Sequence, residues 1–184
     1  MTNSTTQLVE KFNNRFATVR PDNNSYSQNG WKGIGYDSNI GICEIAKVIR
    51  TAVKQKYPNV KISATTSKYS GGQSLSVNLM SAPFEVFATP DASKLRGADL
   101  TWGEADAMQR WTSTIESGNF GVNHYYLNEA IYLTDEAKDF FKFINDICRF
   151  FNRDDSDAMT DYFDTNFYYS LGIGKWDKKF IKTN

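Results

Sequence analysis

The segment from residue 154 to residue 164 contains five aspartates. Hard cations bind carboxylates that lie at such short spacing. The five are Asp154, Asp155, Asp157, Asp161 and Asp164. An EF-hand calcium loop also needs a glycine at its sixth position and a glutamate at its twelfth. Counted from Asp155, those two positions hold Thr160 and Asn166, so the segment does not match an EF-hand.

Three interpretations of this acidic segment stay open. Asp155 or Ser156 is suited to cap a short helix, with Asp157 in the first turn of that helix. Alternatively, Asp155, Asp157 and Asp161 would hold a divalent cation, as a metal-dependent hydrolase requires. The third interpretation is a surface that binds a partner.

The single histidine, His124, is the other residue whose type suggests catalysis, because nucleophilic triads and zinc sites both use histidine. It lies beside Tyr125 and Tyr126, and no serine or cysteine in a recognisable nucleophile motif accompanies it. The sequence also lacks G-x-S-x-G, P-loop, H-E-x-x-H and C-x-x-C motifs. A half-buried residue in a strand or loop is therefore the simpler interpretation of His124.

Charge is distributed unevenly along the chain. Residues 44–68 contain six basic side chains and one acidic side chain, whereas residues 129–164 contain ten acids and four bases. Within the basic region, Lys47, Arg50 and Lys54 are candidates for contact with phosphates. The alternative is that these side chains solvate an exposed helix face, or that the basic and acidic regions face each other.

The stretch SKYSGGQSLSVNL, residues 67–79, places a lysine and a tyrosine beside two glycines. The glycines suit the positive φ angles of a tight turn between strands, since a phosphate-binding loop would lead from a strand into a helix. An exposed Tyr69 could stack on a nucleobase, or its ring could lie back over the sheet. The candidate binding residues at this turn are Lys68, Tyr69, Ser70, Gly71 and Gly72.

A helix and a hairpin must position these basic residues. Apolar residues at helical intervals predict an amphipathic helix over 39–57, which Asp37 or Ser38 is suited to cap and which Pro58 ends. After the proline the apolar period changes to two. This change predicts two half-buried strands over 60–79, joined as a hairpin at the glycines.

The rest of the chain completes the predicted fold. Thr101 and Glu104 match the pattern of a capping box, Thr134 is suited to cap the helix after it, and residues 21–38 predict a long loop. Together the elements predict an α+β fold of two layers, in which a small antiparallel sheet packs against helices. The remaining predicted elements are helices over 5–19, 101–118 and 135–152 and a C-terminal strand near 166–173.

The composition is that of a globular protein. The 184 residues are 40% hydrophobic and 23% charged, and their net charge is zero, which argues against a general nucleic-acid binder. Cys43 and Cys148 lack metal-ligand spacing and are expected to be small buried residues of a reduced protein. No apolar run reaches the length of a membrane span, and the N-terminus lacks a signal-peptide pattern. We therefore expect a cytoplasmic protein that makes no membrane contact.

Several motifs in the chain match a known family. The matching stretches are Ala46–Arg50 and Lys56–Pro58 in the helix, Lys61–Gly72 in the hairpin and Asp154–Tyr168 in the acidic segment. With them the sequence resembles the large polyvalent protein-associated domain 29 over most of residues 36–180, and Gly172–Phe180 looks like part of the same closing element. The length of the chain predicts one domain over 1–184. Within it, the resemblance implies a family-like core over 38–180, with residues 1–37 as a decoration.

Such domains occur in giant multidomain proteins of phages and conjugative elements and as short proteins of gut bacteria. The resemblance therefore implies a bacterial, cytoplasmic accessory role connected with mobile genetic elements. It carries over no catalytic residue, and we expect no cofactor. We expect a non-enzymatic binding module that engages a protein or a nucleic acid through the basic helix and hairpin. The alternatives are a metal-dependent hydrolase that uses the Asp154–Asp164 cluster and a structural protein-interaction domain.

Overall fold

The computed structural model describes residues 4–23, 25–27, 29–101 and 103–184. The chain divides into two compact units, and each is described by itself. Unit 1 comprises Met1–Pro58, Ala64–Val77 and Phe143–Ser170, and unit 2 comprises Asn59–Ser63, Asn78–Lys142 and Leu171–Asn184. The expected division into a decoration and a family-like core stays a prediction.

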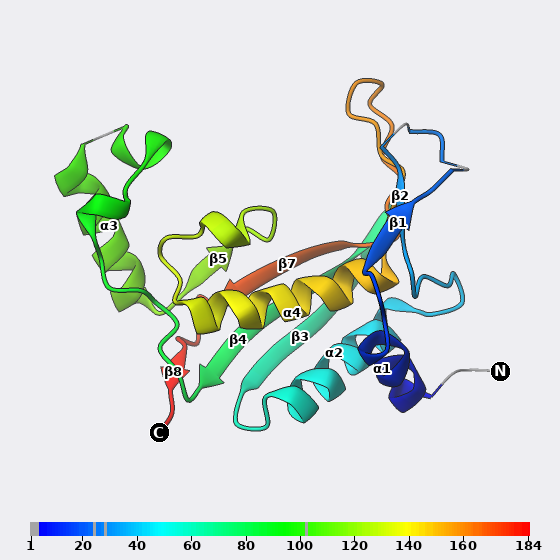
Figure 1. Ribbon diagram of the computed structural model, residues 1–184, viewed down its shortest axis with the longest axis horizontal. Helices are drawn as coiled ribbons and strands as arrows, with labels where there is room; N and C mark the ends of the chain where they lie inside the picture. Colours follow the sequence, from blue (N-terminus) through cyan, green and yellow to red (C-terminus); the bar gives the residue numbers. More distant parts are fainter. Residues whose placement is uncertain (1–3, 24, 28, 102) are drawn as a thin grey trace. The chain divides into compact units, whose positions relative to one another are not determined.

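About 36% of the chain is helical and about 26% is in strands, which confirms the predicted α+β fold (Figure 1). The described α-helices are α1 (Thr5–Asn13), α2 (Ile42–Lys56), α3 (Glu104–Ser117) and α4 (Asp135–Phe151). The short 3-10 helices are η1 (Ala92–Lys94), η2 (Gly97–Leu100) and η3 (Leu127–Glu129). None of the helices in the described part of the chain is long and apolar enough to cross a membrane.

The strands form two sheets. The first has the order β1–β2–β6, with β1 (Val19–Pro21), β2 (Trp31–Gly33) and β6 (Arg153–Asp154). The second has the order β3–β4–β7–β5, with β3 (Lys61–Tyr69), β4 (Gly72–Ala82), β7 (Tyr168–Ile173) and β5 (Phe120–Val122). A short strand, β8 (Ile181–Lys182), pairs with β4 in parallel, whereas β5 pairs with β7 in the antiparallel direction.

The predicted hairpin is confirmed. Strand β3 ends at Tyr69 and β4 begins at Gly72, so Ser70 and Gly71 alone form the turn. Gly71 has a φ of 86°, which is the left-handed conformation that glycine adopts without strain. The C-terminal strand that alternating apolar residues predict near 166–173 is β7.

Helix α2 positions the basic residues because its other face is buried. Ile42, Ile45 and Ile49 are among the side chains that this face places in the core. The residue that precedes the helix is Gly41, which makes no side-chain capping bond, so the predicted cap at Asp37 or Ser38 is wrong. Asp37 instead closes a local turn by accepting a hydrogen bond from the Asn39 amide at 2.9 Å.

The segment predicted as a long loop contains β2, which packs against the end of α4. The Gly33 amide donates to the Asn152 carbonyl at 2.8 Å, and the Gly35 amide donates to the Phe150 carbonyl at 2.9 Å. These bonds satisfy carbonyls at the helix end, which have no partner inside the helix. A Cβ on Gly33 would lie 2.2 Å from the Phe150 oxygen, so only glycine permits this approach.

Two helix starts test the predicted caps. Thr134 caps α4, because its hydroxyl accepts a hydrogen bond from the Ala137 amide at 3.2 Å, as predicted. Helix α3 begins at Glu104 behind Gly103, whose φ is 96° and which makes no side-chain capping bond. The predicted capping box of Thr101 and Glu104 is therefore wrong, since Thr101 lies two residues before the capping position.

The two cysteines differ in exposure. Cys148 is buried as expected, and burial raises the pKa of its thiol. Cys43 is exposed, which corrects the expectation that both cysteines are buried. Its position is one residue after the buried Ile42, so the helical period turns its side chain outward.

Candidate functional site

The basic residues of α2 share one exposed face of the helix. Lys47, Arg50 and Lys54 are all exposed and follow Cys43 at intervals of four, three and four residues. Side chains at these intervals lie one above another on a helix. We call Lys47, Arg50 and Lys54 the basic stripe.

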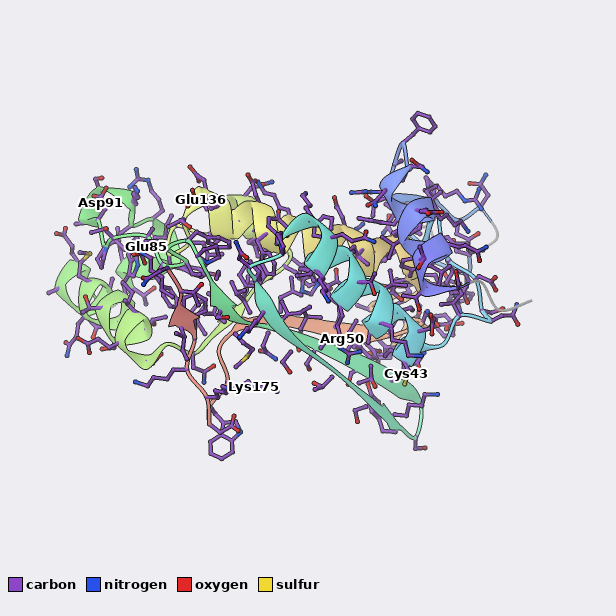
Figure 2. All side chains as sticks on the ribbon, turned by 90° about the horizontal axis from the view of Figure 1, so that it is seen from below. Cys43, Arg50, Glu85, Asp91, Glu136 and Lys175 are labelled. Atoms are coloured by element: carbon purple, nitrogen blue, oxygen red, sulfur yellow. The ribbon has the colours of Figure 1, made fainter. Side chains whose placement is uncertain are left out.

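The basic stripe runs beside strand β3. The Arg50 guanidinium donates to the Ala64 carbonyl of β3, and the Cys43 sulfur lies 3.6 Å from the Thr66 hydroxyl. Figure 2 labels Arg50 and Cys43 on α2, on the side of the helix next to the hairpin. Because β3 is an edge strand of its sheet, the basic stripe borders a strand whose one strand neighbour in the described part of the chain is β4.

The cations of this surface differ in their partners. Lys47 pairs with Glu44 at 3.3 Å, and the Thr5 hydroxyl and then Lys47 lower the pKa of Glu44 by hydrogen bonding to its carboxylate. Lys54 and Lys68 are exposed and form no ion pair with a described residue. Their charges are therefore not offset by a bound carboxylate in the described part of the chain.

Tyr69 is half-exposed beside the hairpin turn. The side chain is 50% exposed, and a Cβ on Gly72 would lie 3.0 Å from a ring carbon of Tyr69. The ring therefore lies close to the backbone of Gly72, and half of the side chain's surface is open to solvent. Lys68 alternates with Tyr69 along β3, so it points to the α2 side of the strand together with Thr66.

The face of the hairpin that carries Tyr69 is rich in hydroxyl groups. Counted from the two-residue turn, Ser67 lies opposite Ser74 and Thr65 lies opposite Ser76. The Ser76 hydroxyl lies 3.0 Å from the Ser170 hydroxyl of β7. Sequence reasoning missed this surface, which we call the hydroxyl face; in unit 1 it comprises Thr65, Ser67, Tyr69, Ser74, Ser76, Tyr168 and Ser170. None of these seven side chains carries a formal charge at neutral pH.

The acidic segment is held by its own hydrogen bonds. Asp155 is 9% exposed, and its carboxylate accepts hydrogen bonds from the amides of Tyr26 at 2.8 Å and Ser27 at 2.7 Å. Figure 1 shows the loop around residues 155–165 (orange) next to β1 and β2 (blue). The predicted short helix capped by Asp155 or Ser156 is wrong, because Asp155 bonds to the N-terminal segment instead.

Other aspartates of the segment also have partners. Asp164 accepts two hydrogen bonds of 2.7 Å from Arg153, and this bonding raises the pKa of the Arg153 guanidinium. Asp157 accepts from the Met159 amide at 2.9 Å. Among the described residues, no group of three or more His, Cys, Asp or Glu side chains is placed to hold a metal ion. A cation site on Asp155, Asp157 and Asp161 stays a prediction.

An aromatic cluster near this segment was not predicted. The rings of Tyr26 and Tyr162 lie 4.8 Å apart between centroids, and both side chains are exposed. In the same loop as Tyr162, Met159 is 92% exposed and Phe163 is 63% exposed. We call these four residues the aromatic tip. No local pattern could have brought residue 26 beside residue 162.

His124 has the surroundings that the sequence suggests. It is half-buried in the turn after β5, and its ring centroid lies 4.1 Å from that of Tyr125. This ring contact is with an aromatic side chain.

Comparison with known proteins agrees with the resemblance seen in the sequence. No curated protein and no solved structure matches the chain. The sequence model of the family described as "Large polyvalent protein associated domain 29" matches residues 40–131, which is half of the chain. The matched residues include α2, the hairpin of β3 and β4, and α3, whereas the acidic segment lies outside them. The chain belongs to the family of large polyvalent protein associated domain 29.

Proposed function

We propose that the chain is a non-enzymatic binding module that holds a single-stranded nucleic acid along strand β3. The basic stripe and Lys68 would contact phosphates, and Tyr69 would stack on a base. The observation that carries this proposal is the alignment of three exposed cations on α2 beside an edge strand that ends in Lys68 and a half-exposed tyrosine.

The contacts of the basic stripe support a site for phosphates. Arg50 is fixed by its bond to the Ala64 carbonyl, and a guanidinium has further N–H donors that can reach an anion. Lys54 and Lys68 would add two charges that form no ion pair with described residues. Such contacts give affinity without sequence preference, because all phosphates are alike.

The hydroxyl face supports a single strand over a duplex. Stacking on an aromatic ring needs an unpaired base whose face is accessible, and Tyr69 offers a half-exposed ring. The neighbouring Ser and Thr hydroxyls donate and accept hydrogen bonds, so they can contact base edges without repelling phosphates. The uncharged hydroxyl face and the basic stripe border the same strand.

The test is salt-dependent binding of a fluorescein-labelled 15-nucleotide oligothymidine, measured by fluorescence anisotropy. With three to four phosphate contacts, log K should fall against log salt with a slope of about −2 to −3. Lys54→Gln and Lys68→Gln should each reduce the magnitude of that slope by about 0.7. Tyr69→Ala should weaken binding by about 1–3 kcal/mol and leave the slope unchanged.

Lys94→Gln is the control, because Lys94 is an exposed lysine of η1 that lies outside the basic stripe. It should leave both affinity and slope at the wild-type values. If Lys54→Gln and Lys94→Gln lost affinity equally, binding would depend only on net charge. A lack of salt-dependent binding would refute the site. Tighter binding of a 15-base-pair duplex would refute the preference for single strands.

A role in protein interaction is the second candidate, favoured by the aromatic tip. Exposed apolar clusters of this kind mark protein–protein contact sites. Because Asp157, Asp161 and Asp164 lie close to Met159, Tyr162 and Phe163 in the sequence, a lysine-rich peptide is the fitting probe. A labelled 12-residue peptide of alternating Lys and Leu should bind, and Phe163→Ser should weaken its binding by at least fivefold. Binding that Phe163→Ser leaves unchanged would contradict this candidate.

A further inference from the structure

Unit 2 contains an apolar pocket that neither candidate function uses. Its volume is about 230 Å³, and it lies between α3 and the segment that contains β5 and Tyr132. The lining residues that matter here are Leu95, Arg110, Trp111, Thr114, Phe120 and Tyr132. Concave, mostly apolar sites with a few polar groups are where proteins bind small molecules.

The walls of the pocket are aromatic and fixed. Trp111 is buried with Leu95, and its indole N–H donates to the Ala88 carbonyl at 3.2 Å. The rings of Phe120 and Tyr132 meet edge to face, with centroids 4.4 Å apart. Burial raises the pKa of Tyr132, so its hydroxyl stays neutral at physiological pH. Rings held in this way offer faces and edges on which another aromatic ring packs favourably.

One cation stands at the rim of the pocket. Arg110 precedes Trp111 on α3, and its guanidinium is oriented by an ion pair of 2.7 Å with Asp106. Asp106 does not line the pocket, and none of the lining residues is acidic. The Thr114 hydroxyl donates to the Arg110 carbonyl one turn earlier in the same helix, so this donor is already used within α3. The polar group best suited to select a ligand is therefore the guanidinium.

We propose that this pocket binds a small aromatic carboxylate, with its ring among Trp111, Phe120 and Tyr132 and its carboxylate at Arg110. A cavity of about 150 Å³ accepts a benzene ring, so about 230 Å³ has room for a ring with a carboxylate. Carboxylates bind guanidinium groups through charge-assisted hydrogen bonds. This site goes beyond the nucleic-acid surface proposed above and does not depend on it.

Benzoate is the probe, and the full chain is titrated while the Trp111 indole N–H signal is followed by NMR. Benzoate should shift this signal saturably with a dissociation constant of about 0.1–1 mM, as expected for nine non-hydrogen atoms. Benzyl alcohol should bind at least threefold more weakly, and benzylamine more weakly still. Acetate, which has the charge without the ring, should not shift the signal.

Two variants separate the ring from the charge. Arg110→Gln should abolish the preference for benzoate over benzyl alcohol, whereas Lys178→Gln, which removes an exposed charge of unit 2 outside the pocket lining, should preserve it. Thr114→Phe, at a half-buried lining position, should block the pocket and abolish binding of both compounds. The proposal is overturned if benzoate causes no saturable shift of the Trp111 indole N–H signal at concentrations up to about 20-fold above the weakest expected dissociation constant of about 1 mM. It is also overturned if acetate shifts the Trp111 signal as benzoate does, or if Arg110→Gln keeps the preference for benzoate over benzyl alcohol. Binding of either aromatic compound by Thr114→Phe would overturn it as well.

Discussion

Asp155 shows how one side chain can hold distant parts of the chain together. Its buried carboxylate accepts hydrogen bonds from the backbone amides of residues 26 and 27, and the preceding residue, Asp154, belongs to β6. Hydrogen bonds to a charged acceptor are stronger than those between neutral groups. Asp155, which the sequence suggested as a candidate metal ligand, thus makes structural hydrogen bonds within unit 1.

Replacing Asp155 should therefore destabilise the protein. Asp155→Asn retains one acceptor and turns an amide donor toward backbone N–H groups, so the free energy of unfolding should fall by about 2–3 kcal/mol. Asp157→Asn is the matched control, because an asparagine oxygen can still accept from the Met159 amide. Urea unfolding followed by circular dichroism measures both. A loss for Asp157→Asn as large as that for Asp155→Asn would contradict this role.

The hydrogen bond between Thr5 and Glu44 predicts how stability depends on pH. The Thr5 hydroxyl bonds to the Glu44 carboxylate and lowers the pKa of Glu44 in the folded protein. A lowered folded-state pKa adds stability above the unfolded pKa, and this stability is lost as the pH falls through the folded value. Thr5→Val should raise the pKa of Glu44 toward its ordinary value and flatten this part of the stability profile. Carboxyl ¹³C titration by NMR measures the shift.

Thr6→Val is the control for that titration, since Thr6 is an exposed neighbour in α1 and is not among the groups that shift Glu44. Its titration curve for Glu44 should overlay that of the wild type. If Thr5→Val also overlays the wild type, the Thr5 hydroxyl does not hold the carboxylate in solution.

At the scale of elements, local sequence patterns predicted the helices and strands whose formation depends on neighbouring residues. The change of period after Pro58 predicted α2 and the hairpin, and the positive φ of Gly71 followed from the glycine itself. Strand β2 was predicted as part of a loop. It pairs with the short strand β1, but its other bonding partners lie more than a hundred residues away, at the end of α4 and in β6, where a local pattern cannot reveal them. The basic stripe was predictable from helical spacing, but the hydroxyl face required knowing that β7 joins β4.

The approach of β2 to α4 predicts a steric test. Gly33→Ser would place a Cβ 2.2 Å from the Phe150 carbonyl oxygen, so backbone must shift and the free energy of unfolding should fall by about 3 kcal/mol or more. Gly41→Ser makes the same substitution where a Cβ meets nothing within 4 Å, and serine is a favourable residue at the start of α2. Its stability should equal or slightly exceed that of the wild type, as thermal unfolding would show. Equal losses in both variants would argue against the close packing.

At the scale of the whole molecule, the N-terminal segment bears on what can fold alone. Helix α1 lies beside α2 and buries Leu8, Val9 and Phe12 almost completely (Figure 1). The Phe12 ring meets the edges of Phe143 and Phe150, with centroids 5.7 and 5.5 Å apart. Within unit 1, the first 37 residues therefore supply core side chains as well as β1 and β2.

A chain of residues 38–184 should consequently fail to fold cooperatively. Removing α1 would expose apolar surface of α2 and α4, and removing β2 would leave carbonyls at the end of α4 without their donors. Loss of near-UV circular dichroism and of a sharp thermal transition would show this. A truncated chain with the wild-type transition would instead establish residues 38–180 as a core that folds independently.

Paired point variants test the same contribution without deleting residues. Phe12→Ala removes a fully buried ring and should lower the free energy of unfolding by about 3–5 kcal/mol, because the ring's transfer energy is lost and a cavity is left. Phe16→Ala makes the same change at a fully exposed position, where almost no buried surface is lost, and should change stability by less than about 0.5 kcal/mol. A small loss for Phe12→Ala would mean that the aromatic packing of α1 contributes little to unit 1. A large loss would explain why truncation is destructive even though the family match begins only at residue 40.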